Sequence, residues 1–286
     1  MKKNIFLLAF AMIALAACEK NDEVMNEPTG KVLTTFAVTG DFEVPTFSGM
    51  TRAVTADGKA MTDLWVLDYA GGLLVQQLHQ TAEDEDFGSP AMALDFGQHH
   101  VYFVCSRGKT PALSTDGHII CWGSPSDTFY KDFSVNVTAG ASATHNVTLQ
   151  RVATRLSVTI NDELPSGLST VDIVPDTWHY AIDYLTGLPT GAQTAEPLTI
   201  SIPASYAGRT NTTLSIYGLS GATEWTTDVT ITARDGEDDI LGQATISGAP
   251  FVANRVTNYS GNLFCSNSGF AMTLNDAWDD AVSGEW

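Results

Sequence analysis

Residues 227–234, TDVTITAR, decide the fold class, because apolar and polar side chains alternate along their length. Val229 and Ile231 fall on one face and threonines on the other, which is the period-two pattern of a β-strand with one buried face. Residues 155–160 (RLSVTI) and 197–203 (PLTISIP) repeat this pattern. No segment carries apolar residues at helical spacing over a length that would make a stable helix. The chain is therefore predicted to be all-β.

Turn residues divide the chain into many short strands. Gly, Pro, Asn or Asp interrupts the alternating runs at intervals of about 8–15 residues, and the strands number about fifteen. This is too many for one small sandwich, and turn residues cluster at residues 161–167, NDELPSG. We therefore expect two antiparallel β-sandwich domains in tandem, residues 31–161 and residues 162–286.

One hairpin can be predicted directly from the sequence. Residues 64–69, LWVLDY, turn through Ala70, Gly71 and Gly72 into residues 73–78, LLVQQL. Glycine tolerates the positive φ angles that a tight hairpin turn requires.

The N-terminus is predicted to be a signal peptide, residues 1–17. Lys2 and Lys3 precede the apolar residues 5–17, a run too short for the 18–20 apolar residues that a membrane-crossing helix needs. Removal of residues 1–17, which hold these two lysines and no acid, changes the net charge from −19 to −21.

The residue that follows the apolar run is a cysteine, Cys18. Residues 15–18, LAAC, resemble the lipobox of bacterial lipoproteins, and this resemblance implies attachment of diacylglycerol to the Cys18 thiol and cleavage before it. Two or three acyl chains anchor a protein stably to a membrane. The alternative is an ordinary secretion signal in which the cysteine falls there by chance. Residues 18–30 are then a flexible, acidic tether, and Glu19, Asp22 and Glu23 resemble the export signal of outer-membrane surface lipoproteins.

The strongly acidic composition limits the classes of partner. A surface with this charge repels nucleic acid and anionic lipid headgroups, so we expect no nucleic acid among the partners. A host ligand or a glycan is a partner class that the composition leaves open. The hydrophobic content of 44% is sufficient for one or two cores.

Signatures of catalysis and of cofactor binding are absent from the sequence. It contains no H-E-x-x-H, G-x-S-x-G, G-x-G-x-x-G or P-loop pattern. His99 and His100 are adjacent at the start of a strand, so their side chains face opposite sides and cannot share a metal; we expect an edge or turn pair. We expect no enzyme, cofactor or metal. A hydrolase whose two carboxylates are brought together only by folding stays open as a weaker alternative.

Two acidic clusters and three cysteines have less specific interpretations. Residues 82–88 and 234–240 lack the register of a calcium loop and are expected to be solvated loops. Cys105 and Cys121 lie in strand-like runs, and Cys265 has no obvious mate. Buried, unbonded cysteines are expected, with a Cys105–Cys121 disulfide as the alternative.

Aromatic residues near predicted turns and strand ends indicate a second candidate function. Exposed aromatic rings can stack on sugars, which makes a surface glycan-binding lipoprotein the alternative hypothesis, although such rings in sandwiches also serve cores and interfaces. The candidates are Trp122, Trp178, Tyr180, Trp225 and Trp278.

Three stretches together resemble the fimbrillin family, the lipoprotein subunits of type V pili of anaerobic Gram-negative bacteria. They are residues 62–77 (TDLWVLDYAGGLLVQQ), 147–162 (VTLQRVATRLSVTIND) and 254–264 (NRVTNYSGNLF). The resemblance implies two transthyretin-like β-sandwich domains and export to the outer membrane as a lipoprotein. It also implies a location in the fimbrium, a role in cell adhesion, and assembly with other fimbrial subunits by exchange of a β-strand.

The same resemblance implies a cleavage site and a donor strand. Arg52 lies between a first strand, residues 31–40, and the strand at 64–69, where the arginine-specific protease of polymerising members would cut; the alternative is a solvated loop residue. Residues 269–280 place Phe270, Met272 and Leu274 on one face as a short donor strand or an ordinary last strand. Shaft-forming members carry a long donor segment, so this chain is expected to be an anchor or minor accessory subunit.

Overall fold

The computed structural model describes residues 30–40, 61–107, 110–114, 118–123, 125–190, 198–220, 224–265 and 269–275. These residues form nineteen β-strands in four sheets and one turn of 3-10 helix, η1 (Ala204–Tyr206). The predicted all-β class is confirmed. No helix within these ranges combines the length and the apolar character required to cross a bilayer.

The N-terminal unit is built from one seven-stranded sheet in the order β3-β2-β5-β8-β9-β1-β4. Its side chains fill a single core that includes Phe36, Phe103 and Phe129, so the sheet folds over on itself where β8 meets β9. Alternating apolar residues face this core, as in β4, where only Met92 and Leu94 are buried. The strands are β1 (Lys31–Gly40), β2 (Asp63–Ala70), β3 (Leu73–Thr81), β4 (Ala91–Asp95), β5 (Gly97–Ser106), β8 (Thr128–Val137) and β9 (Ala143–Arg151).

The C-terminal unit encloses its core between two four-stranded sheets, β15-β10-β18-β19 and β14-β11-β16-β17. Leu156 of the first sheet and Ile231 of the second are fully buried in it. The strands are β10 (Ala153–Ile160), β11 (Leu168–Pro175), β14 (Leu198–Ser201), β15 (Thr212–Leu219), β16 (Trp225–Asp235), β17 (Ile240–Phe251), β18 (Val256–Asn262) and β19 (Gly269–Asn275).

The position of β10 bears on the boundary between the units. β10 pairs with β15 and β18, and its apolar side chains lie in the C-terminal core. Residues 161–167, where the sequence places the boundary, connect β10 to β11 inside the C-terminal unit. We propose instead that the boundary lies at Val152, between β9 and β10.

The predicted hairpin is confirmed. β2 and β3 pair antiparallel, and Gly71 and Gly72 form the turn with φ angles of 59° and 79°. Two consecutive positive φ angles define a turn whose twist matches that of the flanking strands.

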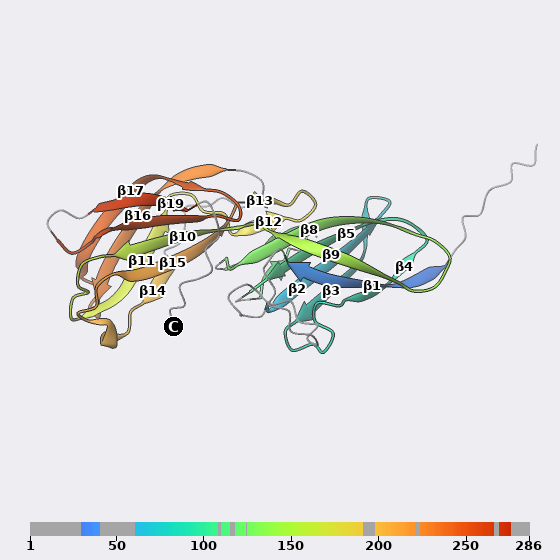
Figure 1. Cartoon of the computed structure of the whole chain (residues 1–286), viewed down its shortest axis with the longest axis horizontal. Helices are drawn as coiled ribbons and strands as arrows, with labels where there is room; N and C mark the ends of the chain where they lie inside the picture. Colours follow the sequence, from blue (N-terminus) through green and yellow to red (C-terminus); the bar gives the residue numbers. More distant parts are fainter. Residues whose placement is uncertain are drawn as a thin grey trace, which may run out of the picture.

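A fourth sheet, here called the joint, connects the two units in the order β13-β12-β7-β6. β6 (Ala112–Leu113) and β7 (Ile119–Cys121) follow β5, whereas β12 (Ala181–Asp183) and β13 (Leu188–Thr190) follow β11. The joint lies between the two lobes of the molecule (Figure 1). A third core, which includes Tyr102, Trp122 and Tyr184, lies beneath it.

The two units repeat one topology. In sheet order, β3-β2-β5-β8 corresponds to β14-β11-β16-β17, and β9-β1-β4 corresponds to β18-β10-β15. The orientations agree as well: the first strand of each unit pairs parallel with one neighbour and antiparallel with the other. β19 is the one strand of the C-terminal unit without a counterpart among the described strands of the N-terminal unit.

Candidate assembly site

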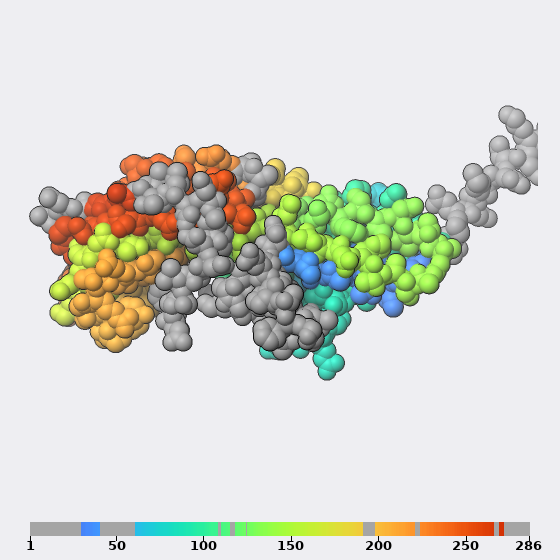
Figure 2. All heavy atoms as spheres, viewed as in Figure 1, coloured from blue at the N-terminus to red at the C-terminus, as the bar shows by residue number. Residues whose placement is uncertain are grey.

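The first strand, β1, lies between two other strands of the N-terminal unit. It pairs antiparallel with β4, from Lys31↔Asp95 to Thr35↔Ala91, and parallel with β9. In Figure 2 the blue atoms of β1 lie at the surface alongside the yellow-green atoms of β9. Among the described strands β4 pairs only with β1. The place of β4 in the sheet therefore depends on β1.

Burial of alternate side chains shows how much β1 contributes to the core. Val32, Phe36 and Val38 are at most 7% exposed, whereas Leu33 on the opposite face is 52% exposed. Full burial of such side chains is worth about 1.5–3 kcal/mol each, so loss of β1 removes roughly 5–9 kcal/mol. A typical domain is stable by only about 5–15 kcal/mol in total. The N-terminal unit thus needs a strand in this place to remain folded.

Phe36 is the central contact of β1. Its ring lies edge-on to Phe103 of β5, at 5.2 Å between centroids, and to Phe133 of β8, at 6.1 Å. Its backbone N–H donates to the Pro90 carbonyl at 2.9 Å. β1 therefore connects both halves of the folded sheet.

The connection that follows β1 is long. Residues 41–62 join β1 to β2, whereas residues 161–167 join the equivalent β10 and β11. Arg52 falls in the first of these connections, and Cys18 falls before β1; both lie outside the described residues.

The C-terminal strand predicted from Phe270, Met272 and Leu274 is present as β19. It pairs antiparallel with β18, with Met272 opposite Tyr259 and Leu274 opposite Thr257. Phe270 is half-buried against the C-terminal core, and the side chains of Met272 and Leu274 lie outside the described atoms.

Gly261 of β18 allows this pairing. A Cβ atom at this position would collide with the Gly269 carbonyl and lie 2.7 Å from the Phe270 Cα. Only a residue without a side chain permits so close an approach of the two backbones.

A buried ion pair ties β4 to the other half of the sheet. His99 Nδ1 lies 2.7 Å from Asp68 Oδ1, and His99 Nε2 lies 2.8 Å from the Asp95 carbonyl at the end of β4. Both contacts need a proton, so Nε2–H donates to the carbonyl and a further proton lies between Nδ1 and Oδ1. Burial raises the pKa of Asp68, and the hydrogen bond with His99 opposes that rise.

The two adjacent histidines face opposite sides of β5, as predicted. The His99 side chain is 1% exposed and that of His100 is 56% exposed. The expected edge or turn location is wrong, because β5 lies between β2 and β8. His99 is buried because Asp68 of the neighbouring strand supplies its partner.

Comparison with known proteins shows the fold. No family model matches the sequence, and no curated protein matches it. A proposed adhesin from Bacteroides ovatus has a similar solved structure, with a TM-score of 0.51 and 11% identity over 82% of this chain and 87% of that chain. The chain has a fimbrillin-like fold.

Two other solved structures are similar to this chain. The tip fimbrial protein Mfa3 from Porphyromonas gingivalis, truncated at its C-terminus, has a TM-score of 0.42 and 13% identity over 86% of this chain and 99% of that chain. A fimbrial assembly protein from Parabacteroides distasonis has a TM-score of 0.46 and 8% identity over 87% of this chain and 99% of that chain.

The aromatic residues considered as sugar platforms mostly serve the cores of this fimbrillin-like fold. Trp122 and Trp178 are each 2% exposed, so their assignment as platforms is wrong. Trp225 stacks on Phe251 at 4.6 Å between ring centroids, and Tyr180 is half-buried. Trp278 lies outside the described residues. Trp122 lies in the third core, whereas Trp178 lies in the C-terminal core and Trp225 packs against it.

The three cysteines among the described residues, Cys105, Cys121 and Cys265, are unbonded. Cys105 is buried, as predicted, and burial raises the pKa of its thiol. Cys121 is half-buried and Cys265 is exposed, so the expected burial of these two is wrong. Cys121 lies in the joint and its thiol donates to the Ala112 carbonyl at 3.5 Å.

Both acidic clusters form turns, as predicted. Asp84 accepts a hydrogen bond from the Thr81 N–H at 2.6 Å. In the β16–β17 turn, Asp235 accepts from the N–H groups of Glu237 and Asp239, both at 2.9 Å. Within the described ranges, no group of three His, Cys, Asp or Glu side chains is placed to hold a metal.

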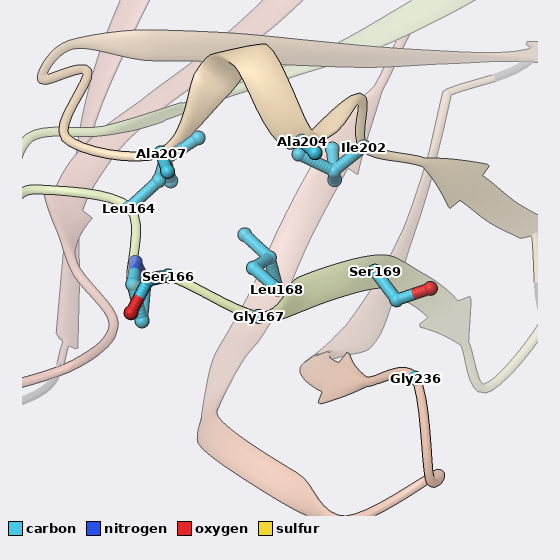
Figure 3. Close-up of a pocket in the computed structure, with 10 residues that line it drawn as sticks. Leu164, Ser166, Gly167, Leu168, Ser169, Ile202, Ala204, Ala207 and Gly236 are labelled. Carbon is cyan, nitrogen blue, oxygen red and sulfur yellow. The ribbon is translucent and has the colours of Figure 1, made fainter.

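A shallow pocket lies at the far end of the C-terminal unit, where the β10–β11 connection, η1 and the β16–β17 turn meet (Figure 3). Leu168 and Ile202 form its apolar floor. None of its lining residues is titratable: Leu164, Pro165, Ser166, Gly167, Leu168, Ser169, Ile202, Ala204, Ala207 and Gly236. This pocket therefore has no side chain for acid–base chemistry.

Proposed function

We propose that this chain is a non-enzymatic, lipid-anchored fimbrial subunit at the outer-membrane surface, an anchor or minor accessory subunit that serves adhesion. Its two units are transthyretin-like β-sandwich domains, and it assembles with other subunits through a shared β-strand. The observation that carries the proposal is the position of β1, which is buried between β4 and β9 yet joined to β2 by the long segment 41–62. A strand held in this way can be replaced by another strand with the same alternation.

Cys18 would connect this strand to the membrane. A lipid on Cys18 is joined to Lys31, where β1 begins, by residues 19–30. An uncut chain keeps β1 in place, so the lipid, the tether and the N-terminal unit stay covalently linked. Cleavage after Arg52 would leave β1 held only by its pairing and packing, and a strand from another subunit could then take its place.

The similar structures support a surface role. The proposed adhesin shares the fold over most of both chains. Assembly of a fimbrial subunit by strand exchange requires a stable fold. It requires no catalytic group.

The test is the intact mass and the N-terminal residue of the protein isolated from cells. A lipidated Cys18 start supports the anchor, and an Ala53 start supports polymerisation after cleavage at Arg52. An unlipidated start at any other residue would contradict both forms of the proposal.

A second measurement tests assembly. A fimbrial subunit forms ladders with partner subunits that resist SDS, and Phe36→Asp in β1 should abolish them because it places a charge in the core. Leu33→Asp is the matched control, since Leu33 lies on the exposed face of the same strand. A monomeric protein whose tryptophan fluorescence is quenched saturably by polysaccharide would favour the glycan-binding alternative.

A further inference from the structure

The repeated topology reveals a difference between the two units at one sheet edge. In the C-terminal unit β18 pairs with β10 on one side and with β19 on the other, and β19 also contacts β17. In the N-terminal unit the equivalent strand, β9, pairs with β1 on one side. On its other side β9 pairs with β8 only at Gln150 and Arg151.

The remaining part of this edge, residues 143–149, has no strand partner on the β8 side among the described residues. Unpaired backbone groups along a strand favour the addition of another strand. The exposed side chains Thr144, Asn146 and Thr148 carry no charge that would oppose such pairing.

Aromatic rings lie at the opening between β8 and β9. Phe133 and His145 are half-buried there, with ring centroids 5.7 Å apart. Phe36 lies behind both, at 6.1 Å from Phe133 and 6.0 Å from His145. An added strand with alternate apolar side chains would cover this surface, as Phe270 covers the core in the C-terminal unit.

The distribution of charged residues along the sequence also favours contact between the β8–β9 edge and a C-terminal strand. Residues 256–275 and 133–150 are the two longest stretches without Asp, Glu, Lys or Arg in a chain of net charge −19. The first contains β18 and β19, and the second contains the second half of β8 and all of β9 except Arg151. Two copies of so acidic a chain repel each other over most of their surfaces. Close contact between these two uncharged stretches avoids that electrostatic repulsion.

We propose that the β8–β9 edge of the N-terminal unit accepts the C-terminal strand, residues 269–275, of a second copy of this chain, after that strand has left β18 of its own copy. The strand runs antiparallel to β9, as β19 runs antiparallel to β18. Phe270, Met272 and Leu274 share one face of it and cover Phe133 and His145. The inference deepens the proposed function and rests on it: an anchor that keeps β1 has no vacancy between β4 and β9, so its neighbour must use another edge.

The test uses the mature full-length chain and a synthetic peptide of residues 266–277, with a photoreactive benzophenone side chain in place of Phe270. The expected cross-links map to residues 133–150. Cross-links at β4, residues 91–95, would mean that the peptide replaces β1; they would overturn this inference and leave the proposed strand exchange intact. Absence of a saturable cross-link, or cross-links elsewhere, would also overturn it.

A pair of variants tests the same edge by affinity. His145→Lys places a charge beside Phe133 and should weaken peptide binding about tenfold or more. His100→Lys, at an exposed position of β5, should bind the peptide as the unmodified chain does. Unchanged affinity of a folded H145K protein would overturn the inference, and if H145K fails to fold, the cross-link map of the unmodified chain decides alone.

Discussion

The hydroxyl groups of Tyr69 and Tyr184 lie 3.0 Å apart, one from β2 of the N-terminal unit and one from the turn between β12 and β13. Tyr130 of β8 donates a second hydrogen bond to the Tyr184 carbonyl at 2.9 Å. Burial raises the pKa of both Tyr130 and Tyr184, so both hydroxyls keep their protons at neutral pH. The two units therefore share a core at the joint, and their stabilities are coupled.

Replacement of Tyr184 should uncouple the units. Tyr184→Ala removes a fully buried ring from the third core, and loss of a large buried aromatic side chain costs about 3–5 kcal/mol. We expect denaturant unfolding to change from one transition to two, measured by fluorescence and by circular dichroism. Leu185→Ala, at a position 37% exposed, is the control and should leave a single transition. One unshifted transition in Y184A would show that the coupling of the two units does not depend on Tyr184.

The sequence predicts the strands well because alternation is a local property. Residues 227–234 form part of β16 with Val229 and Ile231 buried, and the β2–β3 hairpin follows from Gly71 and Gly72. In residues 31–40 residue type alone does not give the buried face, because Thr34 is buried with Val32, Phe36 and Val38 whereas Leu33 is exposed.

Features that depend on distant partners could not be predicted. A cluster of turn residues marks any loop, so residues 161–167 look like a boundary although β10 packs with the strands that follow. Asp68 lies far from His99 in the sequence, and nothing near either residue indicates their pairing. Similarly, Trp122 is buried because the joint forms a third core from loops of both units.

Phe36 should be the residue of β1 on which the N-terminal unit depends most. Phe36→Ala removes the contacts with Phe103 and Phe133, and we expect a loss of about 3–5 kcal/mol in the free energy of unfolding. The control Leu33→Ala, on the exposed face of β1, should change it by less than about 0.5 kcal/mol. Equal effects of the two substitutions in urea titrations would contradict the structure, in which Phe36 faces the core and Leu33 is exposed.

The buried pair of His99 and Asp68 should show strong coupling. His99→Leu leaves Asp68 buried without its hydrogen-bond partner, and loss of one partner of a buried pair typically costs about 3–5 kcal/mol. The double variant H99L/D68L removes both polar groups and should be more stable than H99L alone. His100→Leu is the control on the exposed face of β5. A double variant less stable than either single variant in denaturant titrations would contradict this coupling, because the two substitutions would then destabilise the fold independently.

The close approach of β18 and β19 should depend on Gly261. Gly261→Ala forces a methyl group against the backbone of Gly269 and Phe270, and we expect faster amide hydrogen exchange in residues 269–275. Gly269→Ala is the matched control, because no atom lies within 4 Å of a Cβ built there. Exchange that is equally slow in both variants would mean that the two backbones accommodate the methyl group without loss of pairing.

His179 should make the C-terminal unit sensitive to acid. The ring lies edge-on to Trp225, 5.0 Å between centroids, and its Nδ1 has no hydrogen-bond partner among the described residues. Burial lowers the pKa of His179 below its ordinary value of 6.5, so the unfolded chain binds a proton more readily than the folded chain. This contribution to stability is complete above pH 6.5 and is lost as the pH falls through the lowered pKa.

His179→Gln removes the titrating ring. As the pH is lowered from 7.5, the free energy of unfolding of the H179Q protein should therefore fall less than that of the unmodified chain. Urea titrations across this range measure the difference, and His100→Gln, which replaces an exposed histidine, should retain the full acid dependence. If H179Q and the unmodified chain lost stability in parallel, the acid sensitivity would have to come from another group, because a neutral amide cannot contribute a proton-linked term.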